Sequence, residues 1–241
     1  YLARHGVAFE VVPGVTAGLA ACAYAGFPGT HRGVATVVSL VTGHEDPAKD
    51  ALQTDWPALA RLGGTIVVYM TVKQLDTVVS GLVSGGRGAD EPAALIENAT
   101  LPQQRTVTGT LGTIAYQARQ AGVEPPAVLV VGPVVRLRDR ETWFESRPLF
   151  GKRVMVTRPR ERAAPLRRML DERGACVIEM PMIRVEPVDD PTDLDKVLAG
   201  LGDFDWIVFT SAAGVEHVFE RLYANGADAR AFGADARAFG G

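Results

Sequence analysis

Residues 143–158 read WFESRPLFGKRVMVTR, and this stretch separates two α/β patterns that differ from each other. The pattern before it ends with a buried apolar run, and a new strand pattern begins directly after Gly151. A chain of 241 residues has room for two modest domains. The stretch therefore predicts a domain boundary, with one domain over residues 1–146 and a second over residues 147–241.

The composition is that of an ordinary globular protein. Hydrophobic residues make up 47% of the chain, so a sizeable core can be buried. The net charge of -3 argues against general nucleic-acid binding, which usually needs a basic surplus. The longest apolar runs are too short to span a bilayer. Cys22 and Cys176 form no zinc or disulfide pattern, which fits a reducing cytoplasm without a metal site.

The first 146 residues alternate between strand and helix patterns, which predicts a layered α/β domain. Continuous apolar strands indicate burial on both faces of the sheet. The loop-length connection between residues 97 and 105 predicts an antiparallel pair. The predicted strands are Val7–Val12, Val34–Val41, Thr65–Met70, Ala93–Glu97, Arg105–Thr110 and Ala127–Val135, and the predicted helices are Ala17–Ala25, Trp56–Arg61, Val72–Val83 and Ile114–Ala121.

The second part has the strand–helix rhythm of a doubly wound sheet. Its predicted strands are Lys152–Thr157, Val177–Pro181 and Trp206–Thr210, and its predicted helices are Ala163–Arg173, Leu194–Leu201 and Val215–Tyr223. Near the end, residues 226–232 read GADARAF and residues 233–239 repeat them. Two copies are too few for a repeat fold, so a duplication or assembly artefact is favoured. The start at Tyr1, without Met, favours a truncated beginning.

Candidate binding residues in the first part follow strand ends or begin helices. Thr16 and Ala17 follow a Pro-Gly turn, where helix N–H groups face a ligand or where Thr16 simply caps the helix. His31 and Arg32 form a cationic pair that could clamp carboxylates or be solvated. His44 follows a predicted strand end and could titrate near neutrality.

Two further candidates follow predicted strands. Met70 ends a strand, where its soft thioether suits a sulfonium or adenine neighbour, although a core role is the commoner one. Ala99 lies in a polar loop between strands, which could read a nucleoside or be solvated. In the second part, Thr157, Thr210 and Ser211 lie where strands turn into helices, and they fit either anion binding or capping. No dinucleotide, Walker A, nucleophile-elbow or zinc motif occurs.

Several runs of sequence carry a resemblance to a known family. From residue 1 to about 144 the chain closely resembles the C-terminal part of the uroporphyrinogen-III C-methyltransferases, which are tetrapyrrole methylases. The match is carried, in order, by VVPGVTAGLAACAYAGFPGTHRG, VTGHE, GTIVVYM, ENATLPQQRTVTGTL and PPAVLVVGPVVRLRD.

The methylase resemblance implies an S-adenosyl-L-methionine cofactor in a cleft between two α/β domains. Thr16, Ala17, Met70 and Ala99 fall where the family contacts this cofactor, and Ala99 replaces a glycine of many members. Arg32 falls where the family meets substrate carboxylates, and His31 stands beside it. The implied reaction is methylation of two pyrrole carbons of uroporphyrinogen III, giving precorrin-2. The Gly-Pro-Gly-Asp and Gly-Gly-Asp-Pro loops of the family are absent, so the expectation is that this chain does not methylate alone.

The second part is similar to the beginning of uroporphyrinogen-III synthase. The runs WFESRPLFGKRVMVTRPR, GACVIEMPMIRVEP and FDWIVFTSAAGVE carry this match over residues 148–223. It implies cyclisation of hydroxymethylbilane between two α/β lobes, with Thr210 and Ser211 facing the cleft, and an incomplete, inactive synthase unit.

The order of the two parts resembles a bifunctional fusion from a bacterial sirohaem or corrin pathway, and the branch stays open. The methylase part implies a homodimer, with no nucleic-acid or membrane partner. Two alternatives remain: another corrin-ring methyltransferase, or a non-catalytic binding and dimerisation piece.

Overall fold

The structure is a computed structural model that describes residues 1–43, 54–140, 142–228 and 230. The described residues form two compact units, one of Tyr1–Val156 with Ala164–Glu179 and one of Thr157–Ala163 with Met180–Gly241. His44 and the second GADARAF copy lie outside the described residues. The predicted boundary between residues 146 and 147 stays a prediction.

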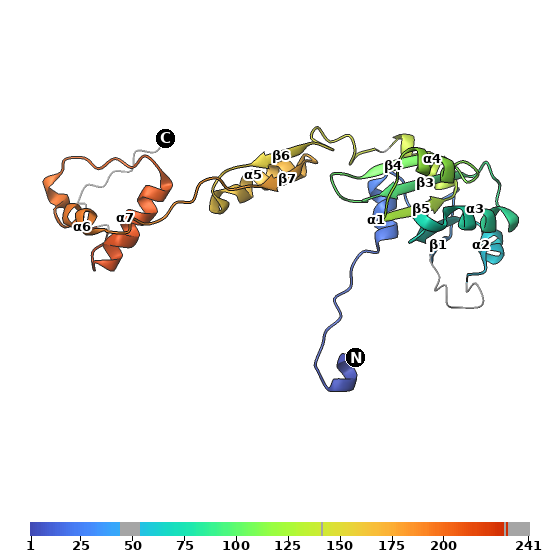
Figure 1. Ribbon diagram of the computed structural model, residues 1–241, viewed down its shortest axis with the longest axis horizontal. Coiled ribbons are helices and arrows are strands. Elements are labelled where there is room, and N and C mark those ends of the chain that lie inside the picture. Colours follow the sequence, from blue (N-terminus) through green and yellow to red (C-terminus); the bar gives the residue numbers. More distant parts are fainter. Residues whose placement is uncertain (44–53, 141, 229, 231–241) are drawn as a thin grey trace. The chain divides into compact units, whose positions relative to one another are not determined.

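The first unit is built on a five-stranded sheet (Figure 1). Parallel pairing joins the first two strands, and every other pair is antiparallel. The first three strands in sequence therefore run in one direction, and their carboxyl ends share one edge of the sheet. The strand order is β1 (Val38–Thr42), β2 (Thr65–Tyr69), β5 (Ala127–Val131), β3 (Pro92–Glu97) and β4 (Arg105–Thr110).

Helices cover both faces of this sheet because successive strand residues point to opposite sides. On one face, Ile66, Val68 and Leu95 pack in a core beneath α2 (Trp56–Leu62), α3 (Leu75–Ser84) and α4 (Ile114–Gln120). On the other face, Val67 and Ile96 pack with α1 (Ala17–Tyr24) and the 3₁₀ helix η3 (Pro133–Arg140). This three-layer arrangement confirms the predicted α/β fold, including the antiparallel β3–β4 pair.

Local sequence explains where the helices begin and which faces they bury. The Asp55 carboxylate accepts a hydrogen bond from the Ala58 N–H (2.9 Å) and caps α2. Leu75, Val78 and Leu82 of α3 are buried, as their helical spacing predicts. The short 3₁₀ helix η2 (Val72–Gln74) leads into α3, and a second one, η1 (Leu2–His5), lies near the start of the chain.

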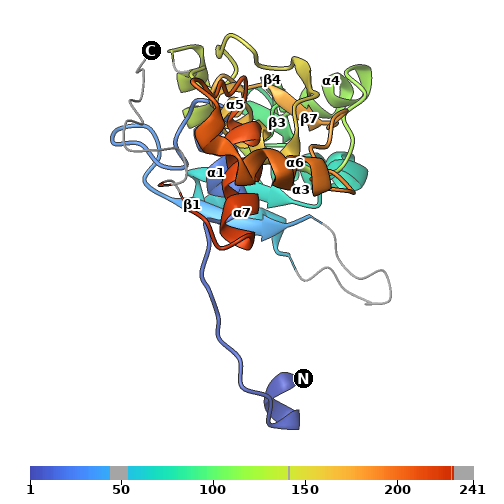
Figure 2. The ribbon, with the colours of Figure 1, turned by 90° about the vertical axis from the view of Figure 1, so that its left-hand side faces the viewer.

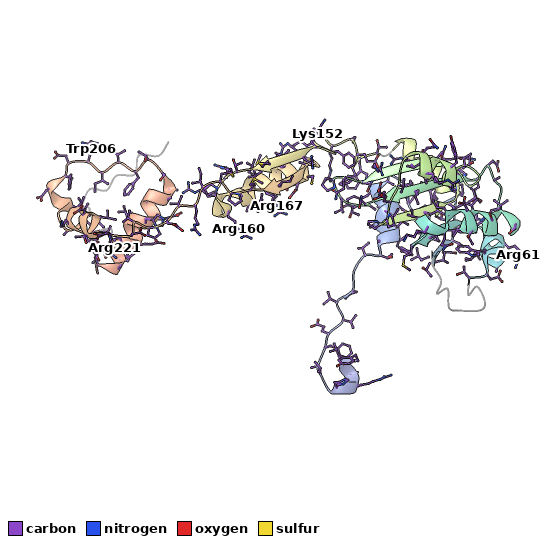
Figure 3. The ribbon with its side chains drawn as sticks, in the orientation of Figure 1. Arg61, Lys152, Arg160, Arg167, Trp206 and Arg221 are labelled. Atoms are coloured by element: carbon purple, nitrogen blue, oxygen red, sulfur yellow. The ribbon has the colours of Figure 1, made fainter. Side chains whose placement is uncertain are left out.

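A separate two-stranded sheet follows residue 150. Its strands β6 (Arg153–Val156) and β7 (Cys176–Glu179) are parallel, and α5 (Arg160–Glu172) connects them. Gly174 ends the connection with a φ of 89°, a left-handed conformation that favours glycine. On α5, Arg167 pairs with Glu179 of β7 at 3.0 Å (Figure 3). A parallel strand–helix–strand unit of this kind is the repeating unit of a doubly wound sheet.

The second unit contains α6 (Thr192–Ala199), the 3₁₀ helix η4 (Leu201–Asp203) and α7 (Ala212–Ala224). Leu198, Leu201 and Leu222 form its small core. Arg221 of α7, labelled in Figure 3, forms a fork with both carboxylate oxygens of Asp195 on α6 (2.7 and 2.5 Å). The ion pair and the apolar cluster thus hold α6 and α7 together.

Four strand predictions are wrong in whole or in part. Val7–Val12 and Trp206–Thr210 form no strand, and the first of them runs as an extended, exposed segment toward α1 (Figure 1, Figure 2). Apolar β-branched runs need a neighbouring strand to supply hydrogen bonds, and neither has one among the described residues. The strand predicted over Val34–Val41 begins only at Val38 and is a half-exposed edge strand rather than a buried one. The strand predicted over Ala127–Val135 ends at Val131, where Gly132 turns the chain into η3.

No helix within the described parts of the chain combines the length and apolar character needed to cross a membrane.

Candidate functional site

The carboxyl edge of β1, β2 and β3 gathers four of the predicted binding residues. Met70 directly follows β2, and Ala99 follows β3 by two residues. Because β5 lies between these strands, their ends stand about 10 Å apart, or two strand spacings. Thr16 and Ala17 reach the same edge at the start of α1. We call Thr16, Ala17, Met70 and Ala99 the carboxyl-edge group.

A single hydroxyl fixes the start of α1 to the end of β2. The Tyr69 hydroxyl lies 2.5 Å from Thr16 Oγ1 and accepts a hydrogen bond from the Gly18 N–H at 3.1 Å. The Thr16 side chain forms no capping bond to its own helix, so the capping alternative is wrong in that detail. Sequence reasoning did not identify this role of Tyr69, because the bond joins residues 53 positions apart.

Gly18 allows this close approach. A Cβ at this position would lie 2.4 Å from the Tyr69 hydroxyl and 2.7 Å from Val67 Cγ1. Any side chain would therefore push α1 away from β2. The packing of α1 at this edge depends on glycine for that reason.

Backbone strain gathers at the same edge. Among the described residues, the non-glycine residues with positive φ are Met70 (51°), Asn98 (49°) and Thr100 (73°). Left-handed backbone is unfavourable for such residues, and it tends to cluster at functional sites. All three flank or belong to the carboxyl-edge group, although no residue pattern predicted them.

The exposure of the group fits a binding surface. Met70 is 62% exposed, so the alternative of a core methionine is wrong. Ala99 packs partly against the core beneath α1. In contrast, Cys22 is fully buried in that core, and burial raises the pKa of its thiol to about 12, which leaves it unreactive.

The other predicted residues lie elsewhere. His31 and Arg32 are exposed in the connection between α1 and β1, where the backbones of His31 and Ala35 form a bridge. No described contact brings them to the carboxyl-edge group. Ser211 caps α7, since its Oγ accepts a hydrogen bond from the Gly214 N–H at 3.0 Å, and Thr210 beside it is exposed. The anion-binding alternative for Thr210 and Ser211 stays a prediction.

Two cavities occur away from the carboxyl-edge group. One, of about 280 Å³, lies in the second unit and is almost wholly apolar, with Phe204, Trp206 and Val208 among its lining residues. The other, of about 380 Å³, lies in the first unit beside β4 and is lined by Thr108, Arg136 and others. Neither is lined by a residue of the predicted cofactor set.

Two family models match this chain, one in each part. Residues 1–115 match the model of the tetrapyrrole (corrin/porphyrin) methylases, and residues 164–238 match that of uroporphyrinogen-III synthase HemD.

Two curated relatives and one solved structure illustrate the similarity. A porphyrin biosynthesis protein HemD from Ruminiclostridium josui is 37% identical over 95% of this chain and 45% of its own length. An S-adenosyl-L-methionine-dependent uroporphyrinogen III methyltransferase from Methanosarcina barkeri is 46% identical over 57% of this chain and 54% of its own length. The X-ray structure of the cobalamin biosynthetic enzyme cobalt precorrin-4 methyltransferase covers 56% of each chain, with 26% identity and a TM-score of 0.51.

The chain thus spans about half the length of the curated relatives it matches. The two family models match in the same order along the chain as the two resemblances read from the sequence. Residues 1–115 are thus similar to the tetrapyrrole methylases, and residues 164–238 are similar to uroporphyrinogen-III synthase.

Proposed function

We propose that residues 1–146 contribute one wall of an S-adenosyl-L-methionine site for the methylation of uroporphyrinogen III to precorrin-2. The observation that carries this proposal is the convergence of Thr16, Met70 and Ala99 at one edge of the sheet. The family match and the name of the Methanosarcina relative support the cofactor and substrate.

The residues of the carboxyl-edge group fit such a cofactor. Met70 presents an exposed, polarisable thioether, which suits a sulfonium or an adenine ring. Ala99 is small, so a nucleoside can approach its backbone. The start of α1 directs N–H groups toward the same edge, and Tyr69 holds it there. When bound, S-adenosyl-L-methionine supplies an electrophilic methyl group; these residues orient it and limit the access of water.

Arg32 and His31 are the proposed contacts for the carboxylates of the substrate. Arg32 is exposed and forms no ion pair within the described ranges, so its guanidinium fork is available to a carboxylate. His31 lies beside it and would add positive charge when protonated.

For residues 147–241 we propose a contribution to the synthase reaction, the cyclisation of hydroxymethylbilane to uroporphyrinogen III. The family match over residues 164–238 supports it. Thr210 and Ser211 at the start of α7 are the proposed substrate contacts. The two reactions are consecutive, because the product of the second segment is the substrate of the first.

A corrin methyltransferase is the second candidate for the first segment. The likeness to cobalt precorrin-4 methyltransferase favours it. The synthase segment on the same chain favours uroporphyrinogen III instead, because that segment belongs to the family that makes it.

Calorimetry with S-adenosylhomocysteine tests the proposed cofactor site. We expect the 241-residue chain to bind it. We expect Met70→Ala to weaken binding by about tenfold, because the exposed Met70 side chain would be buried against the ligand. Met182→Ala is the matched control, because Met182 is also exposed but lies far along the chain. No measurable binding by the parent chain would support a scaffold role instead.

A further inference from the structure

A network of hydrogen bonds links the residues that join the two family segments to the loop beside Ala99 and to the last turn of α1. Glu145, in the WFE run, accepts hydrogen bonds from Gln104 Nε2 (2.9 Å), Thr106 Oγ1 (2.7 Å) and the Arg138 guanidinium. These three donors come from the end of the 98–104 loop, from β4 and from η3. We call Gln104, Arg138, Trp143, Phe144 and Glu145 the junction clasp.

The junction clasp reaches the loop that contains Ala99. Gln104 is only 3% exposed, and its Oε1 accepts the Thr100 N–H at 2.9 Å. Thr100 has a left-handed backbone and is the next residue after Ala99. In the same loop, the Pro102 carbonyl accepts the Gly151 N–H at 3.2 Å. Two residues of the loop are therefore bonded to residues that lie beyond β5 in the sequence. Gln104 is bonded to Glu145, and Pro102 is bonded to Gly151.

The junction clasp also completes the carboxyl end of α1, whose other end carries Thr16 and Ala17. The last carbonyls of a helix lack partners within the helix. Here Trp143 Nε1 donates to Ala23 (2.9 Å), Gln104 Nε2 to Tyr24 (3.2 Å) and Arg138 to Ala25. Phe144 is 4% exposed and packs edge-on against Tyr24.

We propose that Glu145 is a positioning residue for the proposed cofactor site: through Gln104 it fixes the strained loop at Ala99, and through Arg138 it fixes α1. This inference rests on the proposed function. The junction between the two segments is then part of the methylase site. A linker with no such role would need no half-buried carboxylate that accepts hydrogen bonds from three donors.

Hydrogen exchange and ligand affinity, measured on the full 241-residue chain, test this role. Glu145→Ala removes every bond of the carboxylate, and we expect exchange of the Thr100 N–H to rise about tenfold and the Kd for S-adenosylhomocysteine to rise by a similar factor. Glu145→Gln should recover part of both effects, because its amide oxygen can still accept from Gln104. Exchange of the Leu129 and Val130 amides in β5 reports the stability of the core.

Two further variants keep the result interpretable. Thr106→Val removes one hydrogen-bond donor to Glu145 and retains the charge of the carboxylate. It should give smaller changes in the same direction, and it replaces Glu145→Ala as the test if that variant does not fold. Glu124→Gln is the matched control, because Glu124 is an exposed glutamate outside the junction clasp. Neither measurement should change in that control.

The possible outcomes separate this inference from the proposed function. Selective loss of Thr100 protection with weaker binding supports it. Two results for Glu145→Ala would overturn the role of Glu145 and leave the proposed cofactor site in place. One is exchange of the Thr100 N–H that does not change relative to the β5 amides. The other is faster Thr100 exchange with an unchanged affinity for S-adenosylhomocysteine. Absence of binding by the parent chain overturns the proposed function and with it this role, whereas the exchange measurement still shows whether the clasp holds the loop.

Discussion

Tyr69 shows how one side chain can build a binding edge from distant parts of the sequence. Tyr69 is the last residue of β2, and its hydroxyl forms hydrogen bonds with the Thr16 side chain and with the Gly18 N–H of α1. Met70, the next residue, adopts a left-handed backbone and presents its thioether to solvent. The start of α1 and the end of β2 thus form one surface.

Tyr69→Phe isolates the hydroxyl, because it retains the ring. We expect the free energy of unfolding to fall by about 1–3 kcal/mol, because two hydrogen bonds are lost and each has a net value of about 0.5–1.5 kcal/mol. Binding of S-adenosylhomocysteine should weaken several-fold, since α1 loses its attachment at the proposed site. Chemical denaturation and calorimetry measure the two effects. Tyr116→Phe, at an exposed position of α4, is the control, and equal effects in both variants would contradict this role.

Gly18→Ala tests the close packing of α1 on β2. The added methyl would meet the Tyr69 hydroxyl and Val67, so we expect a loss of about 1–3 kcal/mol in the free energy of unfolding, typical of overpacking. Gly14→Ala is a matched control, because a Cβ at Gly14 meets no atom within 4 Å. Thermal or urea unfolding of both variants gives the comparison. A fully tolerated Gly18→Ala would show that α1 does not pack this closely.

At the scale of elements, periodicity predicted most of the first unit. Residue patterns alone predict the buried face of α3, the bounds of β4, and the bounds of β2 and β3 to within one residue. Patterns failed where a strand depends on its neighbours. Trp206–Thr210 has an ideal strand composition but no partner strand in the described structure, and β1 is half-exposed because it lies at the sheet edge.

The candidate site was predictable only in part for a related reason. Thr16, Met70 and Ala99 each follow a recognisable turn or strand end, and the resemblance to the family selected them. Tyr69, Gln104 and Glu145 escaped prediction because their roles depend on contacts across 39 to 80 positions in sequence. A polar residue in a loop reveals such a contact only once the fold brings its partner near.

The pair that joins α6 to α7 gives a pH prediction. Hydrogen bonds from Arg221 and Asn225 lower the pKa of Asp195 to about 2. A carboxylate whose pKa is lower in the folded state than in the unfolded state stabilises the fold at pH values above the unfolded-state pKa. That contribution is lost as the pH falls through the folded-state pKa. We therefore expect the α6–α7 contact to loosen between about pH 4 and pH 2.

A carboxyl-detected NMR titration of Asp195 measures this directly. Arg221→Met should return the pKa of Asp195 toward its ordinary value, because the guanidinium is the main cause of the shift. Asp203, which lies in η4 between the same helices, provides the internal reference in both proteins. An Asp195 midpoint that is the same in the parent and in Arg221→Met would show that the pair does not form in solution.

At the scale of the whole molecule, one chain carries a segment similar to the tetrapyrrole methylases and a segment similar to uroporphyrinogen-III synthase. We further propose that residues 1–146 form a homodimer, as the family resemblance implies. Sedimentation velocity of the 241-residue chain should then show a species of about twice its 25.7 kDa mass that persists on dilution. A protein that remains monomeric at high concentration would contradict this proposal.

The most direct test of the cofactor site is an NMR titration of the isotopically labelled chain with S-adenosylhomocysteine. Our account predicts that the largest shift changes fall on the amides of Ala17, Gly18, Ala99 and Thr100 and on the methyl group of Met70, with β4 and α7 little affected. Shift changes confined to other elements, or none at saturating ligand, would contradict the assignment of the carboxyl edge of β1, β2 and β3 as a cofactor-binding surface.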